Sequence, residues 1–347
     1  MESVEVSVVL ATYNGERFVG QQLESIRRQQ RPPDELVVGD DGSTDGTMAV
    51  VEAFRKSAPF PVTVLRRERV GLAVNFLRTF EESSGTFVAF CDQDDVWVPQ
   101  KLDVLLAAAH DHRADLVVHG RRTVDENLRP LRSSHQTVRR PTVEDRLQGN
   151  LWWPVAGNAI LFRRSLFDGC DWEHRPMSPW STDPMNHDDL VKLLAAVKGR
   201  LVRIPDELVH YRQHPDNVAG AMMTMTEAMR QRNDHRARVL HQVDAATAWS
   251  RYFPELVGPD RRGQTERYFT DAAARMRERA LRLEDSGISP LVGLVASAAR
   301  GRYSRRATDG LGSKAFLQDL YYFADRRHRS PETTRADDGT AAGPAGR

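Results

Sequence analysis

The distribution of apolar and polar positions over the first hundred residues predicts alternating strands and helices. Four short runs are typical of strands, and the run at 6–11 is continuously apolar, as expected of a strand buried on both faces. The predicted strands are 6–11, 35–39, 62–65 and 86–91, and the predicted helices between them are 16–29, 43–55 and 72–82. This alternation predicts a parallel sheet with right-handed crossover connections.

The pattern changes twice further along the chain. From about 115 to 220 we expect a helix at 190–197, a polar hairpin, and strands at 116–119, 158–162, 201–204 and 208–211. Beyond about 220 the chain becomes rich in Arg and Ala, with helical spacing at 227–250 and 264–283. We therefore predict an α/β domain with a mostly parallel sheet flanked by helices over 1–220, a helical C-terminal region over 221–328, and a disordered tail over 329–347.

Composition narrows the class of protein. The 347 residues are 40% hydrophobic and 28% charged, with a formal net charge of +1, which is ordinary for a globular protein and does not point to nucleic acid as a partner. Cys91 and Cys170 form no CxxC pair, so we expect neither a zinc motif nor a disulfide framework. The N-terminal residues lack a basic segment, and no apolar run reaches the roughly 20 residues that span a bilayer. These features predict a cytoplasmic protein, at most in peripheral contact with a membrane.

Polar clusters follow three of the predicted strands, at the edge where open parallel sheets bind their ligands. The first cluster is Thr12-Tyr13-Asn14-Gly15, directly after Ala11. The Tyr ring can stack on a base, and Asn and Gly permit a tight turn. An ordinary turn explains this cluster equally well when it is considered alone.

The second cluster extends from Asp40 to Thr47. A carboxylate at the tip of a strand can accept hydrogen bonds from the imide N–H of uracil or thymine, or from ribose hydroxyls. Residues 43–45 can cap the helix that follows. Because capping needs only one of them, Asp40 and Asp41 are left as candidate nucleotide-binding residues.

The third cluster contains Asp92, Asp94 and Asp95. Three carboxylates within four residues repel one another unless a cation lies among them, and clustered oxygen ligands suit Mg²⁺ or Mn²⁺. A solvated acidic turn is the alternative for this cluster alone. Taken together, the three clusters predict one pocket that reads a base, reads a ribose and holds a metal ion for a diphosphate.

The residues of these clusters resemble a known family. The segments VSVVLATYNGERFVGQQLESIRRQ, ELVVGDDGSTDGT and GTFVAFCDQDDVWVPQKL are similar to family-2 glycosyltransferases with the GT-A fold, and the resemblance covers about residues 4–220. It implies inverting transfer from a nucleoside-diphosphate sugar, with Mg²⁺ or Mn²⁺ as cofactor. It also implies nucleotide-sugar contacts from the first two loops and the acidic motif, at Ala11, Thr12, Tyr13, Asn14, Asp40, Asp41, Asp92 and Asp94. By the same resemblance Asp94 and Asp95 are candidate metal ligands, with Asp95 favoured for direct ligation.

A later segment, NHDDLVKLLAAVKGRLVRIPDELVHYRQHPDNVAG, is similar to the rhamnosyltransferase-like branch that serves bacterial polysaccharide synthesis. The resemblance makes Asp188 the candidate catalytic base, with the adjacent Asp189 as the alternative. A helix N-terminus favours an ionised Asp, whereas simple capping of the helix is the competing interpretation. In the YRQH segment, Arg212 suits the diphosphate and His214 suits the diphosphate or its metal.

Several alternatives stay open at this point. Trp152 and Trp153 could stack on a sugar or pack in the core, and Asn158 could line the acceptor side. The predicted donor is a dTDP- or UDP-sugar, with rhamnose favoured by the resemblance, and the predicted acceptor is a glycan or a lipid-linked glycan. The apolar segment 288–299 and the arginines after it could contact a membrane surface or belong to the core. A catalytically silent nucleotide-sugar-binding scaffold is the second function considered. A nucleotidyltransferase is the third, although no Gly-rich basic phosphate loop follows the first strand.

Overall fold

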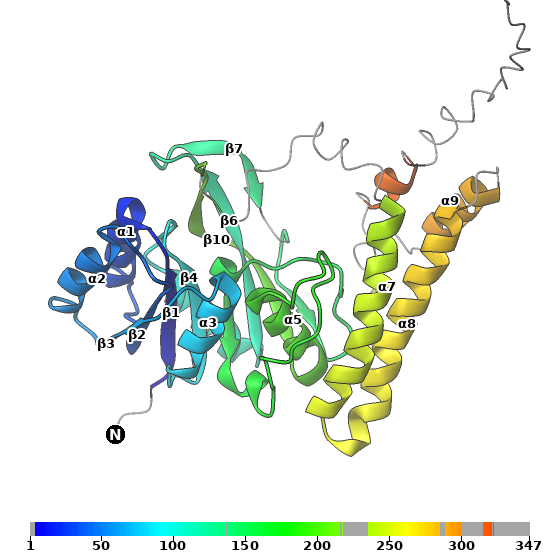
Figure 1. The fold of residues 1–347 in the computed structure, drawn as a ribbon, viewed down its shortest axis with the longest axis horizontal. Helices are drawn as coiled ribbons and strands as arrows, with labels where there is room; N and C mark the ends of the chain where they lie inside the picture. Colours follow the sequence, from blue (N-terminus) through cyan, green and yellow to red (C-terminus); the bar gives the residue numbers. More distant parts are fainter. Residues whose placement is uncertain are drawn as a thin grey trace, which may run out of the picture. The chain divides into compact units, whose positions relative to one another are not determined.

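The structure is a computed structural model that describes residues 4–135, 138–215, 217, 235–284, 289–299, 315–320 and 322 (Figure 1). The chain divides into two compact units, residues 1–277 and 278–347. The described residues beyond 235 are mostly helical, as predicted, although the segments 227–234 and 329–347 of those predictions lie outside the described residues.

Ten strands of the first unit form one sheet, in the order β3-β2-β1-β4-β9-β6-β10-β5, with β7 paired to β6 and β8 paired to β10. Their bounds are β1 Val6–Thr12, β2 Glu35–Asp40, β3 Val62–Arg66, β4 Phe87–Asp92, β5 Val96–Trp97, β6 Leu116–Val124, β7 Pro130–His135, β8 Thr142–Glu144, β9 Ile160–Arg163 and β10 Leu201–Arg212. The strands β3, β2, β1, β4, β6 and β10 all run in the same direction, whereas β9 lies antiparallel between β4 and β6. The prediction of a mostly parallel sheet is therefore confirmed.

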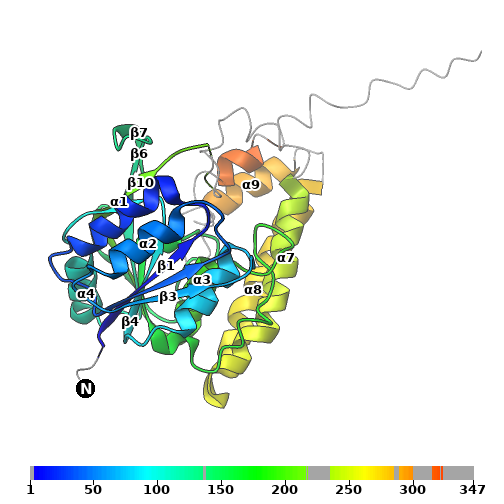
Figure 2. The ribbon, with the colours of Figure 1, turned by 60° about the vertical axis from the view of Figure 1, so that its left-hand side comes forward.

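Helices cover both faces of this sheet (Figure 2). Their bounds are α1 Glu16–Arg27, α2 Thr47–Arg55, α3 Leu72–Glu81, α4 Lys101–Asp111 and α5 His187–Lys198. On one face, apolar side chains of α1, α2 and α4 form a core with alternate residues of β1, such as Val8 and Leu10. On the other face, Phe76 of α3 packs against Phe90 of β4, with ring centroids 5.0 Å apart. The continuous apolar strands follow from this burial on both sides.

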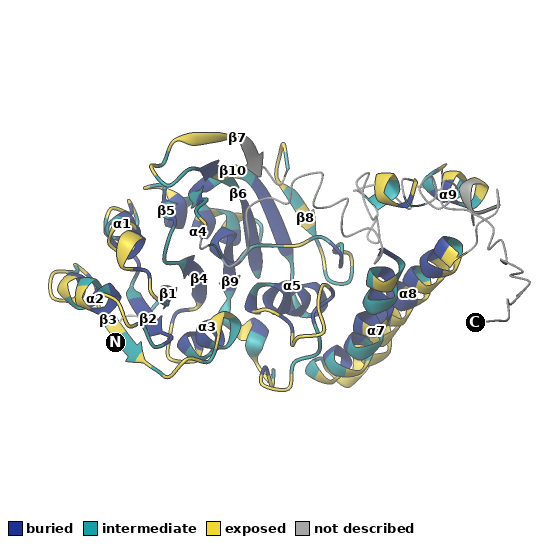
Figure 3. Cartoon of the chain, turned by 45° about the horizontal axis from the view of Figure 1, so that its top comes forward, coloured by how far each residue is buried: buried dark blue, intermediate teal, exposed yellow. Residues whose placement is uncertain are grey.

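Two predicted elements differ from the structure. The strands expected at 201–204 and 208–211 are one strand, β10, whose pairing register with β6 shifts around Glu207. Pro205 lies within this irregular stretch and has no N–H for the ladder, which made one strand look like two. The predicted cap of α2 is also not observed, because that helix begins after Gly46 without a side-chain cap. Figure 3 shows the central strands β4, β6 and β9 as almost entirely buried.

The first unit also contains α7, His235–Tyr252, and most of α8, Pro259–Glu284. Trp249 of α7 is fully buried and packs against Trp152 at 5.7 Å and against Phe269 of α8 at 6.0 Å. Of the two interpretations given to Trp152, core packing is thus the one observed. In the second unit, Arg279 and Asp319 form a buried ion pair at 2.8 Å.

The membrane-contact prediction concerned the segment 288–306. Its described part is α9, Ser289–Ala299, in which Val292 and Val295 are exposed. The arginines at 300–306 lie outside the described residues. Among the helices that the structure describes, none is long and apolar enough to cross a bilayer.

Candidate functional site

The three polar clusters lie at one edge of the sheet, because the strands that carry them are neighbours. Strand β1 pairs with β2 on one side and with β4 on the other. Thr12 is the register partner of Asp40, and Ala11 is the register partner of Asp92. The expectation that the first two loops and the acidic motif converge is confirmed.

The first two loops are bound to each other by hydrogen bonds. Asp40 accepts the Thr12 hydroxyl at 3.0 Å and the Ser43 N–H at 2.9 Å. Asn14 adopts a positive φ of 46° and accepts the Thr44 N–H on its side-chain oxygen at 2.8 Å. Residues 43 and 44, which we expected to cap a helix, therefore join the two loops instead.

Asp41 has an internal function of its own. Its carboxylate is buried and accepts the N–H groups of Val70 at 2.6 Å and Gly71 at 3.0 Å, which fixes the loop before α3. Asp40 and Asp41 were the two carboxylates that capping left unexplained, and loop closure accounts for both. Their contact with a nucleotide stays a prediction.

The backbone of Tyr13 is held by the side chain of Gln93, a residue that was not among the predicted site residues. Gln93 accepts the Tyr13 N–H at 2.9 Å and donates to the Tyr13 carbonyl oxygen, also at 2.9 Å. The Arg69 guanidinium lies over the Tyr13 ring at 4.1 Å and donates to its hydroxyl at 2.9 Å. The signal in the sequence was an amide side chain placed between acidic residues, which suits a group that must both donate and accept.

Asp95 is fully buried, and both of its oxygens are engaged. One oxygen accepts the Arg212 N–H at 3.1 Å, and the other accepts the Asn158 amide at 2.5 Å. Lys101 lies directly behind, donating to the Asn158 carbonyl oxygen at 2.7 Å. Burial and the charge of Asp94 raise the pKa of Asp95 to about 7, and burial lowers the pKa of Lys101 to about 7. Direct metal ligation by Asp95 stays a prediction, and this geometry favours a structural function.

The Asp94 carboxylate is partly exposed, unlike that of the buried Asp95. The Oδ2 atom of Asp94 lies 2.9 Å from Nε2 of His214, whose ring packs on Phe18 at 4.7 Å.

Burial and the charges of Asp95, Asp94 and Asp188 raise the pKa of Asp92 well above its usual range. Among the described residues, no three His, Cys, Asp or Glu side chains converge closely enough to form a metal site alone. The side chains of Asp94 and His214 suit a Mg²⁺ or Mn²⁺ ion that takes one or two protein ligands and completes its coordination shell with phosphate oxygens and water.

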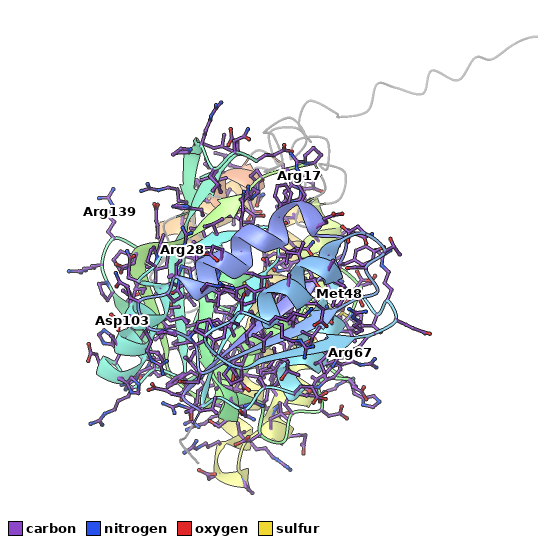
Figure 4. All side chains as sticks on the ribbon, turned by 90° about the vertical axis from the view of Figure 1, so that its left-hand side faces the viewer. Arg17, Arg28, Met48, Arg67, Asp103 and Arg139 are labelled. Carbon is purple, nitrogen blue, oxygen red and sulfur yellow. The ribbon has the colours of Figure 1, made fainter. Side chains whose placement is uncertain are left out.

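Arg212 lies beneath the acidic motif. Its side chain is buried, and it donates to the Asp94 carbonyl oxygen at 2.7 Å, to the Glu126 carbonyl oxygen at 2.5 Å and to the Gln21 side chain at 2.6 Å. With its nitrogens bound in this way, the guanidinium positions the motif, and its predicted contact with a diphosphate has no support in this geometry. Arg17, labelled on α1 in Figure 4, is the more exposed arginine nearby and pairs with Glu126.

The two candidate bases lie in the first turn of α5 and have different surroundings. Neither residue caps the helix, because its N-cap residue is Asn186. Asp189 is buried and pairs with Lys192 at 3.3 Å. Asp188 is half-buried, and its carboxylate accepts the Asp189 N–H at 2.8 Å. Burial raises the pKa of Asp188, which opposes the effect of the helix N-terminus expected from the sequence.

His187 anchors α5 to the sheet. It is buried, its ring stacks on Phe76 at 4.1 Å and meets the edge of Phe90 at 5.1 Å, and neither ring nitrogen has a hydrogen-bond partner. Burial lowers its pKa to about 3. A neutral His187 thus holds Asp188 close enough to the acidic motif for its charge to affect Asp92.

Comparison with known proteins agrees with this arrangement. Residues 7–170 match the model of glycosyl transferase family 2. The chain is 24% identical over 225 residues to an uncharacterized glycosyltransferase of Nostoc sp., a match that covers 62% of this chain and 66% of the relative. It is 34% identical over 98 residues to the dTDP-rhamnosyl transferase RfbG of Shigella flexneri, covering 27% of this chain and 34% of the relative. The chain thus spans about two thirds of the first relative and about one third of the second.

Solved structures agree in fold. The structure of TarS 1–349 of S. aureus in complex with UDP-GlcNAc superposes with a TM-score of 0.53 at 18% identity, covering 93% of this chain and 92% of that chain. This likeness confirms the GT-A arrangement expected from the resemblance. Residues 7–170, just under half of the chain, thus match glycosyl transferase family 2, the family that the sequence motifs resemble.

Proposed function

We propose that this chain is an inverting glycosyltransferase that moves a sugar from a nucleoside-diphosphate donor to a hydroxyl of a glycan or lipid-linked acceptor in cell-surface polysaccharide synthesis. The observation that carries the proposal is the position of Asp188. A half-buried carboxylate, with its neighbour Asp189 already neutralised by Lys192, lies within electrostatic range of the acidic motif. The strand edge that this motif shares with the first two loops is where α/β sheets bind nucleotides.

In the proposed reaction, Asp188 accepts the proton of the acceptor hydroxyl as its oxygen attacks the anomeric carbon. The bond from that carbon to the diphosphate breaks, and the nucleoside diphosphate leaves with the electron pair. A single displacement of this kind inverts the anomeric centre and needs one base. The raised pKa of Asp188 makes it a stronger base than an exposed Asp.

Asp94 and His214 are the residues that would hold a divalent cation, with Asp92 beside them. Such an ion would neutralise charge on the leaving diphosphate. Arg212 and Asn158 hold the motif in place from behind, which favours a preorganised site. Tyr13, fixed by Gln93, offers an aromatic face for the base.

We favour dTDP-rhamnose as the donor. Support comes from the HD and YRQH segments and from the likeness to a relative named as a dTDP-rhamnosyl transferase. UDP-N-acetylglucosamine is the main alternative, since another relative is named poly(ribitol-phosphate) β-N-acetylglucosaminyltransferase.

The test is binding and slow hydrolysis of a panel of dTDP-, UDP- and GDP-sugars, with Mn²⁺, with Mg²⁺ and with EDTA. We expect one donor to bind and to release its nucleoside diphosphate only with metal. Metal-independent hydrolysis would remove the metal from the proposal. A folded protein that binds a donor but neither hydrolyses nor transfers it would support the silent scaffold instead.

A further inference from the structure

One aromatic side chain in the loop that precedes α5 is exposed, although most tryptophan side chains of this chain are buried. Trp180 is 48% exposed, whereas Trp97, Trp152, Trp172 and Trp249 are buried. The sixth tryptophan, Trp153, lies under the Arg203 guanidinium at 3.9 Å. An exposed indole offers a large, flat apolar area with a polar N–H, which suits packing against a ligand.

Trp180 belongs to a closed and supported loop. Met177 and Pro184 form an isolated antiparallel bridge across it, and the Ser178 N–H donates to the Asp183 carbonyl oxygen at 2.9 Å. The Trp180 N–H donates to the Ser178 hydroxyl at 3.1 Å. The backbone that carries the indole is therefore fixed within the loop.

Helix α7 fixes the same loop from outside. His241 contacts the Ser178 carbonyl oxygen at 2.9 Å through Nε2, and Trp249 donates to the Met177 carbonyl oxygen at 3.1 Å. A side chain on a backbone supported in this way loses little conformational entropy on binding a ligand.

The Trp180 side chain lies close to the first turn of α5. It is near enough to the Asp189 carboxylate to lower the pKa of that group, against the raising effect of burial, and Lys192 balances the charge of the carboxylate. The next residue toward the helix start is Asp188, the proposed base. The loop that carries the indole and the helix turn that carries the proposed base thus lie close together at Asp189.

We propose that Trp180 is the platform of an acceptor subsite, on which a pyranose ring of the acceptor glycan packs with its C–H face while its hydroxyl reaches Asp188. The inference rests on the proposed glycosyltransferase function, since it assigns the acceptor side of the same site. The flat apolar face of the Trp180 indole, with the Asp189 carboxylate near it, suits a sugar, because a sugar presents both apolar C–H groups and hydroxyls.

The experiment compares the wild-type chain with Trp180→Ala, Trp180→Phe and the control Val143→Ala, which changes an exposed side chain of β8. Two readouts are measured with the full chain: metal-dependent donor hydrolysis in the absence of acceptor, and binding to an array of bacterial and synthetic oligosaccharides. Thermal unfolding of each variant reports the fold. Donor hydrolysis reports the proposed function, and the array reports the acceptor subsite.

We expect Trp180→Ala to keep donor hydrolysis within about twofold of the wild type and to weaken glycan binding about tenfold or more. Trp180→Phe keeps an aromatic face and should lose less. Val143→Ala should behave as the wild type in both assays. Absence of donor hydrolysis in the wild type would count against the proposed function. The subsite would be overturned if the wild type hydrolysed the donor but bound no glycan. It would also be overturned if Trp180→Ala bound glycans as tightly as the wild type.

Discussion

The Nε2 atom of His214 lies 2.9 Å from the Oδ2 atom of Asp94, although the two residues are 120 positions apart in the chain. The contact joins the end of β10 to the acidic motif after β4. One carboxylate oxygen and one imidazole nitrogen are thus presented together, and the proposed metal site can be tested through this pair.

Replacing His214 by Ala should weaken Mn²⁺-dependent nucleotide binding about tenfold or more, because a ligand or its orienting partner is lost. Isothermal titration with dTDP or UDP, at several Mn²⁺ concentrations, measures the effect. Asp95→Asn is the informative comparison, since Asp95 is enclosed by Arg212 and Asn158. A greater loss of metal affinity in Asp95→Asn than in Asp94→Asn would restore Asp95 as the direct ligand.

Replacing Asp188 by Asn should lower kcat about 10²–10⁴-fold while donor affinity is kept, because the base is lost and the donor contacts are not. Asp189→Asn keeps an acceptor for the Trp180 side chain and should lose less kcat. Single-turnover transfer assays with saturating donor measure both. If Asp189→Asn were the inactive variant, the base would be the neighbouring residue.

The pH dependence of transfer follows from the burial of Asp188. Its pKa is raised above 3.8, and a base acts only when deprotonated, so kcat/KM should rise with pH through that raised value and level off above it. The acid limb should therefore lie above the range of an exposed Asp. A profile measured between pH 4 and 8 tests this, with donor binding at each pH as the control; an acid limb near pH 4 would contradict it.

His187 should make the fold sensitive to acid. Its pKa is about 3 in the folded chain and 6.5 as a reference, so the unfolded chain binds a proton that the folded chain does not. The free energy of unfolding should be fully retained above pH 6.5 and fall as the pH drops toward 3. The loss is on the order of a few kcal/mol. Urea denaturation across this range should show a smaller dependence for His187→Phe, and an unchanged dependence would assign the acid sensitivity to other groups.

Gln93 should contribute to donor affinity through the loop that contains Tyr13. In Gln93→Met, both hydrogen bonds to the Tyr13 backbone are lost, so the Tyr13 ring is less fixed and donor affinity should fall about threefold to tenfold, as for two neutral hydrogen bonds of modest net value. Titration of the nucleoside diphosphate measures this. Gln30→Met serves as the matched control, because Gln30 is exposed and follows the C-terminal end of α1. Equal affinities in the two variants would show that Gln93 does not support the base-binding loop.

Much of the fold could be predicted from the sequence because its signals are local. Continuous apolar runs such as 6–11 and the polar residues after them mark strands and the ligand-binding edge of a parallel sheet. The same reasoning divided β10 into two strands, 201–204 and 208–211, although the strand continues through an irregular register between them. Local patterns record propensity, and pairing with β6 overrides it.

The order of residues along the chain was enough to predict the α/β alternation, the three polar clusters and the candidate pair Asp188-Asp189. What each of these side chains is free to do depends on tertiary contacts. Arg212 is bound by acceptors from distant segments, and Asp189 is neutralised by Lys192 while Trp180 stays largely exposed beside it. Burial and partners are properties of contacts between residues far apart in the chain, and spacing along one strand or helix does not encode them.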